Sequence, residues 1–112
     1  NTGVDLGGRR IINNSIHVIS VAFGYDYNSQ VYDFTSDLGI YCGAPSVSTN
    51  PQFTIDKDVV NSTFDIAANG NQSTDGRLVP NQPLEIYTTA GTSIAAGNGS
   101  VNMEITYRVV AV

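Results

Sequence analysis

Residues Val101 to Val109 read V-N-M-E-I-T-Y-R-V, and this stretch decides the fold class of the chain. Apolar and polar residues alternate in it without a break. The apolar residues share one face: Val101, Met103, Ile105, Tyr107 and Val109. A period of two is typical of a β-strand that is buried on one side. The stretch therefore predicts a strand whose apolar face packs on a core.

The other apolar segments are also short, rich in β-branched and aromatic residues, and bounded by Gly, Asn, Asp or Pro. They predict strands at Ser15 to Phe23, Val31 to Phe34, Leu38 to Cys42, Gln52 to Ile55, Val59 to Ala67 and Leu84 to Thr89. No segment of useful length carries the helical period of about 3.6 residues. This spacing favours an all-β fold, an antiparallel and jelly-roll-like β-sandwich of seven or eight short strands.

The alternation within these strands also predicts the core. Its expected members are the apolar residues at inward-facing positions: Ile19, Val21, Phe23, Phe64, Ile66, Ile86, Met103, Ile105 and Tyr107.

The length of 112 residues suits a single domain with one core. Residues 1–14 show no period and contain several glycines, so we expect an N-terminal arm or linker before one sandwich domain at residues 15–112. Lys57 is the only lysine, which leaves few of the charged residues that protect sheet edges from pairing. Oligomerisation is another way to cover such edges, and we expect the last strand to pair in a sheet or to press against a neighbouring chain.

The net charge of −5 and the pI of about 4.3 argue against nucleic acid or an anionic lipid surface as a partner. No apolar run approaches the roughly 20 residues that a membrane-spanning helix needs, so membrane insertion is not expected.

Residues suited to catalysis or metal binding are sparse. Cys42 is the only cysteine and His17 the only histidine, so they lack partners for a metal site or a catalytic pair, and we interpret Cys42 as a buried, inert thiol. The acidic pairs and clusters, among them Asp26, Asp33 and Asp37, lack the spacing of a calcium-binding loop and are expected to be solvated turn residues. We therefore predict no enzyme activity, no cofactor and no metal, with glycoside hydrolysis by a carboxylate pair as the weaker alternative.

The sequence does suggest residues that contact a partner protein or a sugar. Tyr25 and Tyr27 fall in an expected loop, with Tyr32 shortly after it, and tyrosine suits both protein interfaces and sugar stacking. Arg9 and Arg10 are the densest positive charge of an acidic chain. These five residues are the predicted contact residues.

The C-terminal third, P-N-Q-P-L-E-I-Y-T-T-A-G-T-S-I-A-A-G-N-G-S-V-N-M-E-I-T-Y-R-V-V, resembles the closing hairpin of small β-sandwich structural proteins of tailed bacteriophages, including capsid decoration, head-fibre and tail proteins. The resemblance covers about 30 residues, from Pro80 to Val110, and transfers no functional residue. It implies a virion protein that binds capsid or other virion proteins and forms homo-oligomers.

Two other classes stay open, both secreted or on a cell surface. A carbohydrate-binding module would present its tyrosines to a glycan, although the chain has no tryptophan for stacking. An adhesive subunit has a similar composition, although such domains often carry a disulfide that a single cysteine cannot form.

Overall fold

A computed structural model describes residues 2–4, 10–45, 50–72 and 78–112, and residues 2–4 and 10–12 by their backbone alone. Nine strands and one short helix follow one another in this part of the chain: β1 (Thr2–Val4), β2 (Arg10–Ile12), β3 (Asn14–Asp26), β4 (Leu38–Cys42), β5 (Phe53–Ile55), α1 (Lys57–Val60), β6 (Ile66–Asn69), β7 (Asn71–Gln72), β8 (Leu84–Thr88) and β9 (Ser100–Ala111).

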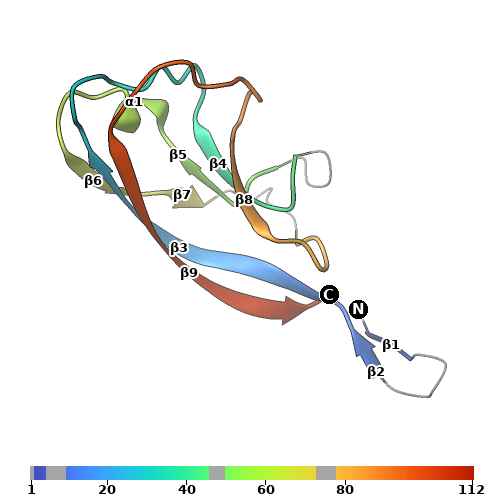
Figure 1. Ribbon diagram of the computed structural model, residues 1–112. Coiled ribbons are helices and arrows are strands. Elements are labelled where there is room, and N and C mark those ends of the chain that lie inside the picture. Colours follow the sequence, from blue (N-terminus) through green and yellow to red (C-terminus); the bar gives the residue numbers. More distant parts are fainter. Residues whose placement is uncertain (1, 5–9, 46–49, 73–77) are drawn as a thin grey trace.

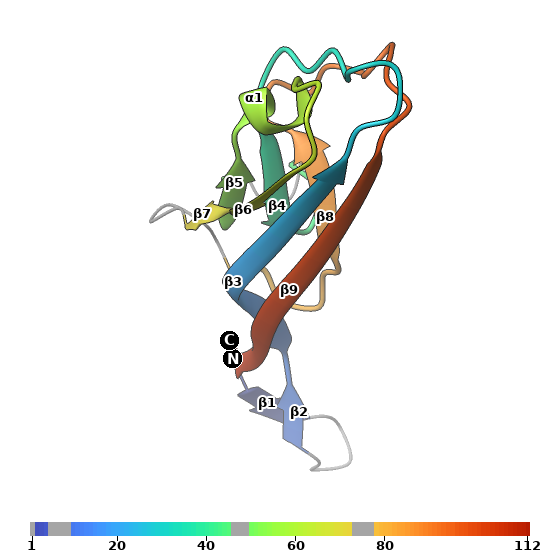
Figure 2. The same cartoon turned by 90° about the vertical axis from the view of Figure 1, so that its left-hand side faces the viewer.

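Seven of these strands form two antiparallel sheets that face each other (Figure 1). The first sheet has the order β6-β3-β9 and the second the order β7-β5-β4-β8. Figure 2 shows β8 and β9, an edge strand of each sheet, on the same side of the molecule. The predicted antiparallel β-sandwich is thereby confirmed.

The two N-terminal strands form a small sheet of their own. Strands β1 and β2 pair with each other from Thr2–Ile12 to Val4–Arg10, and within the described residues they pair with no other strand. They lie beyond one end of the sandwich in both views (Figures 1 and 2). The arm predicted at residues 1–14 thus includes a short hairpin, and its predicted end falls at the start of β3.

Strands β3 and β9 are longer than the short strands expected, with 13 and 12 residues. They pair from Asn14–Ala111 to Asp26–Ser100 and form a curved ribbon that extends past the four-stranded sheet (Figure 1). The ribbon and the hairpin beyond it account for the elongated shape, with principal extents of 58 × 24 × 23 Å. At one end of the ribbon, therefore, no described strand of the second sheet covers the apolar face.

A β-bulge at Ile19 changes the face of β3. Val18 lies opposite Tyr107 and Ser20 opposite Thr106, so Ile19 is an extra residue without a partner. A single extra residue reverses the alternation, which lets both Val18 and Val21 point into the core. Ile19 itself is 48% exposed, and its predicted place in the core was wrong.

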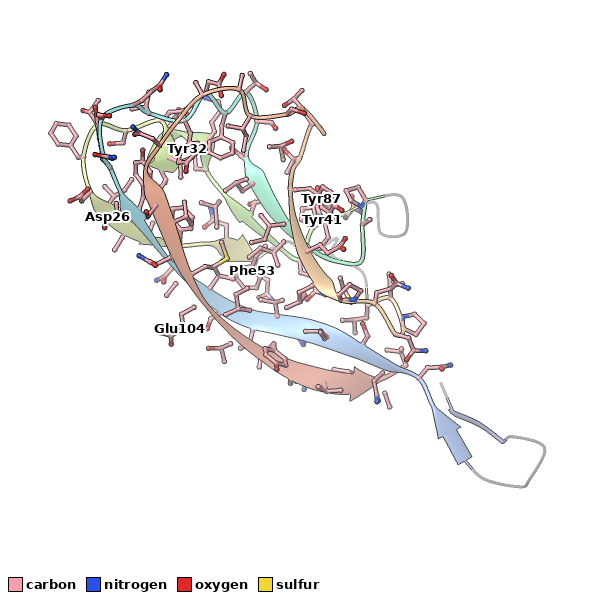
Figure 3. The ribbon with its side chains drawn as sticks, viewed as in Figure 1. Asp26, Tyr32, Tyr41, Phe53, Tyr87 and Glu104 are labelled. Atoms are coloured by element: carbon pink, nitrogen blue, oxygen red, sulfur yellow. The ribbon has the colours of Figure 1, made fainter. Side chains whose placement is uncertain are left out.

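The core lies between the two sheets, where Phe53 is seen in Figure 3. Its buried members are Val18, Val21, Phe23, Tyr25, Phe34, Leu38, Ile40, Phe53, Ile55 and Val60. Of the predicted core, Val21 and Phe23 are buried, whereas Ile66, Met103 and Ile105 are only partly buried and pack against it. Three further predictions were wrong, because one residue lies outside the strands and two lie where the sandwich is open: Phe64, Ile86 and Tyr107.

The strand predicted at Val59 to Ala67 is also wrong over most of its length, because its first residues lie in α1. The carboxylate of Asp56 accepts a hydrogen bond from the backbone N–H of Asp58 at 2.8 Å and caps the helix N-terminus. Only the last residues of that range join β6.

No strand forms at Val31 to Phe34. Instead the side-chain amide of Asn61 accepts from Phe34 N–H at 3.2 Å and donates to Phe34 C=O at 3.0 Å. A side chain thus satisfies this backbone in place of a neighbouring strand.

Gln52 joins the two layers near the bulge. Its side chain is buried, its Oε1 accepts from the backbone N–H of Val18 at 2.7 Å, and its Nε2 donates to the carbonyl of Ile16 at 2.7 Å. Strand β6 pairs with β3 only over residues 22–25. Gln52 therefore provides the hydrogen bonds that a neighbouring strand would otherwise supply to this edge of β3.

Candidate functional site

The two arginines predicted as contacts lie in the N-terminal arm. Arg9 lies outside the described residues, and Arg10 begins β2, where only the backbone is described. Their contact role therefore stays a prediction.

Tyr25 does not lie in a surface loop, and that prediction was wrong. Strand β3 continues through it, with Tyr25 opposite Val101 on one side and Ile66 on the other. The side chain is 2% exposed, and burial raises the pKa of its phenol. A ring in this position contributes to the core and presents no free contact surface.

Tyr27 and Tyr32 also pack against the core instead of facing solvent fully. The ring of Tyr32 lies between those of Tyr25 and Phe34, with ring centres 6.1 and 5.5 Å apart. Its hydroxyl donates to the carbonyl of Gly99 at 2.5 Å. Tyr32, labelled in Figure 3, therefore holds the connection between β8 and β9 against the end of the sandwich.

Polar side chains fasten the same connection to the segment after β3. The amide Oδ1 of Asn98 accepts from the backbone N–H of Ser29 and of Gln30, at 3.1 and 2.9 Å. The carboxylate of Asp33 accepts from Ala96 and Ala95 N–H, and these hydrogen bonds lower its pKa, the bond from Ala96 contributing most. Asp33 thus has a structural role at a loop junction.

The lone histidine and the lone cysteine, His17 and Cys42, each form a hydrogen bond to a different residue. The Nδ1 of His17 accepts a hydrogen bond from Arg108 Nε at 3.1 Å, across the β3–β9 pair. Cys42 is fully buried, as predicted, with its Sγ 3.3 Å from Ser15 Oγ. The described residues include no group of three or more His, Cys, Asp or Glu side chains placed to hold a metal ion.

The outer face of the three-stranded sheet carries a depression of about 570 Å³ that is open to solvent. Small residues that face outward form its floor and polar residues its border: Ala22, Gly24, Ala67, Asn69, Asn102 and Glu104. Figure 3 shows Glu104 on the side of the ribbon that faces away from the second sheet. Phe23 also lines the depression, but it is buried, so none of the described lining residues exposes an aromatic ring on which a sugar could stack.

The most distinctive surface belongs to the edge strands β8 and β9, which lie on the same side of the molecule (Figure 2). We term its apolar residues the open edge, in which Met103 and Ile105 are partly buried and the others are exposed: Ile86 on β8, and Val101, Met103, Ile105, Tyr107 and Val109 on β9. Tyr107 and Val109 are 54% and 61% exposed, although they belong to the apolar face that alternation predicts to be buried. Large apolar side chains grouped in this way mark an interaction surface more often than isolated ones do.

The open edge also includes one side of a strand to which no described strand pairs. Within the described residues β9 pairs only with β3, which makes it an edge strand along its whole length. It contains one acidic and one basic residue, Glu104 and Arg108, and neither proline nor lysine. The sequence signal for this surface was the scarcity of residues that block edge pairing.

Comparisons of the chain with protein-family models, with curated proteins and with solved structures found no match. No helix among the described residues is long and apolar enough to cross a membrane.

Proposed function

We propose that this chain is a non-enzymatic structural protein of a virion, a decoration or accessory protein that binds capsid proteins or neighbouring copies of itself. The observation that carries the proposal is the open edge, where exposed apolar side chains occur on a long edge strand that has a neighbouring strand on one side only among the described residues. Such a surface loses its solvent-exposed apolar area when another chain covers it, and this loss favours assembly.

The N-terminal arm supports the same function. Among the described residues, the strands β1 and β2 pair with neither sheet, so a neighbouring chain could take them up without disturbing the core. Arg9 and Arg10 make residues 1–14 basic, whereas the rest of the chain is acidic. An arm of this charge suits an acidic neighbour, including another copy of this domain.

Deletion of residues 1–12 tests the role of the arm. We expect the circular dichroism spectrum and the melting temperature to stay close to those of the full chain, because the hairpin pairs with neither sheet. Attachment to virion particles, measured by co-sedimentation, should fall. The particles to use are those formed by the virion proteins whose genes flank this one. If no capsid, portal or tail genes flank it, the proposal is contradicted.

A glycan-binding module is the second candidate, and one observation favours it. Phe64 is 73% exposed in the segment between α1 and β6, and an exposed aromatic ring can stack on a sugar. A glycan array separates the two functions. Tight binding that Phe64→Ala abolishes, together with no attachment to particles, would replace the virion proposal.

A further inference from the structure

Among the strands that the structure describes, β9 has a neighbour on one side only, along its full length. Its partner β3 carries the only irregularity of the pair, at Ile19, while the register on β9 runs on without interruption. In an antiparallel ladder alternate residues bond to one neighbour and the residues between them point their N–H and C=O groups to the other side. Strand β9 therefore presents a regular row of donors and acceptors for a further strand.

The charges of β9 are placed symmetrically about Thr106. Glu104 lies two residues before Thr106 and Arg108 two residues after it, all three on the outer face of the sheet. When β9 pairs antiparallel with β9 of a second copy about a two-fold axis at Thr106, each Glu104 lies directly opposite an Arg108 of the other copy. Moving the register by two residues either way removes both of these pairs.

The same β9–β9 register also brings favourable side-chain pairs together on the apolar face of β9. It places Ile105 against Tyr107 of the second copy and Met103 against Val109, which covers the most exposed part of the open edge. Pairs of an aromatic and a β-branched residue are among the favourable cross-strand pairs. The ladder then runs from Val101 to Ala111, almost the whole length of the strand.

The existing contacts leave these groups available. Within the described part of the chain Glu104 has no ion pair or hydrogen bond, and Arg108 is bonded only to His17. A carboxylate from a second copy would reach Arg108 on the exposed face of the sheet without displacing a core contact.

We infer that β9 is a self-pairing edge, through which two copies join about a two-fold axis at Thr106 into one continuous six-stranded sheet with Glu104–Arg108 pairs on both sides of the axis. This inference deepens the proposed function, since it names a neighbouring copy as one partner. A closed two-fold contact also protects both edge strands from open-ended association.

Charge reversal tests the register, with sedimentation velocity over a concentration series as the measurement. We expect the wild-type protein to form dimers. Glu104→Arg and Arg108→Glu should each raise the dimer dissociation constant at least about tenfold, because two attractive cross-strand pairs become two repulsive ones. An equal mixture of the two variants should recover dimers, since in the mixed pair every basic residue again faces an acidic one.

Matched controls change the same charges away from β9. Asp58→Arg and Lys57→Glu, both on α1, should leave dimerisation unchanged. Circular dichroism of every variant shows whether it folds. Wild-type protein that stays monomeric up to its solubility limit, single variants that dimerise like wild type, or folded single variants whose mixture stays monomeric would each overturn the inference.

A disulfide trap provides a second measurement. In the proposed register the two Thr106 residues face each other with Cα atoms about 4.5 to 5.5 Å apart, within the range that a disulfide bridges. Thr106→Cys should therefore form covalent dimers in a mild oxidant, whereas Asn102→Cys should not, because it faces Val110 of the second copy. Equal cross-linking of both variants would contradict the register.

The outcomes distinguish this inference from the proposed function. Monomeric protein that still attaches to virion particles would refute self-pairing alone. Dimers that attach to no particle would refute the virion function and leave the β9 contact intact.

Discussion

The buried side chain of Gln52 offers a sharp test of how the two layers are joined. Replacement by methionine, which has a similar length, removes the acceptor of Val18 N–H and the donor to Ile16 C=O. Val18 is fully buried, so its N–H has no route to water, whereas Ile16 is only partly buried. At about 1 to 3 kcal/mol for each buried group left without a partner, we expect a loss of about 2 to 4 kcal/mol in the free energy of unfolding.

Gln52→Glu distinguishes hydrogen bonding from packing at the same position. The protonated acid can copy the amide, since its carbonyl accepts from Val18 and its hydroxyl donates to Ile16. The ionised form cannot donate, and burial disfavours its charge, so both effects raise the folded-state pKa of the introduced carboxyl above the ordinary value of about 4.3. A raised folded pKa means that the folded state binds more protons, so stability falls as the pH rises from the unfolded pKa through the folded one.

The assay is urea unfolding at several pH values, followed by circular dichroism and tyrosine fluorescence. We expect Gln52→Glu to approach wild type below about pH 4 and to lose stability towards neutral pH. Gln52→Met should differ from wild type by an amount that does not depend on pH. A methionine variant within about 0.5 kcal/mol of wild type, or a glutamate variant whose deficit is constant with pH, would refute the reasoning.

Two further comparisons use matched positions. Gly97 has a φ of +126°, and an added Cβ would clash with the ring of Tyr32, so Gly97→Ala should cost more than about 2 kcal/mol in urea unfolding. Gly91 has a φ of +72° and no atom close to an added Cβ, so Gly91→Ala should cost about 1 kcal/mol. Ile40→Ala should cost about 2 to 5 kcal/mol because the side chain is fully buried, whereas Ile86→Ala, on the open edge, should cost well under 2. If the two glycine variants, or the two isoleucine variants, lost equal free energy of unfolding, the contacts or the burial from which these values derive would be contradicted.

The sequence by itself determined the fold class and most of the strands. Residues 101–109 alternate with the period of a strand, the segment after Ser15 is short and rich in β-branched residues, and local turn residues separate the segments. The buried state of Cys42 was also predictable, because a lone cysteine in an apolar strand behaves as a small hydrophobic residue.

Some elements depended on side-chain hydrogen bonds that periodicity does not reveal. Val59 and Val60 lie in a helical turn because Asp56 caps it, although β-branched residues favour strands. Phe34 stays outside any strand because the Asn61 amide satisfies its backbone.

Only the tertiary structure decided which apolar face is covered. Alternation shows that Tyr107 and Val109 share a face with Ile105, but it carries no information on how far the opposite sheet extends. The β3–β9 ribbon extends beyond the four-stranded sheet. The extra residue at Ile19 changes which side chains of β3 face the core, and no period in the sequence marks this position. The same long-range packing placed Tyr25 in the core and left the open edge exposed, because burial depends on contacts between segments far apart in the chain.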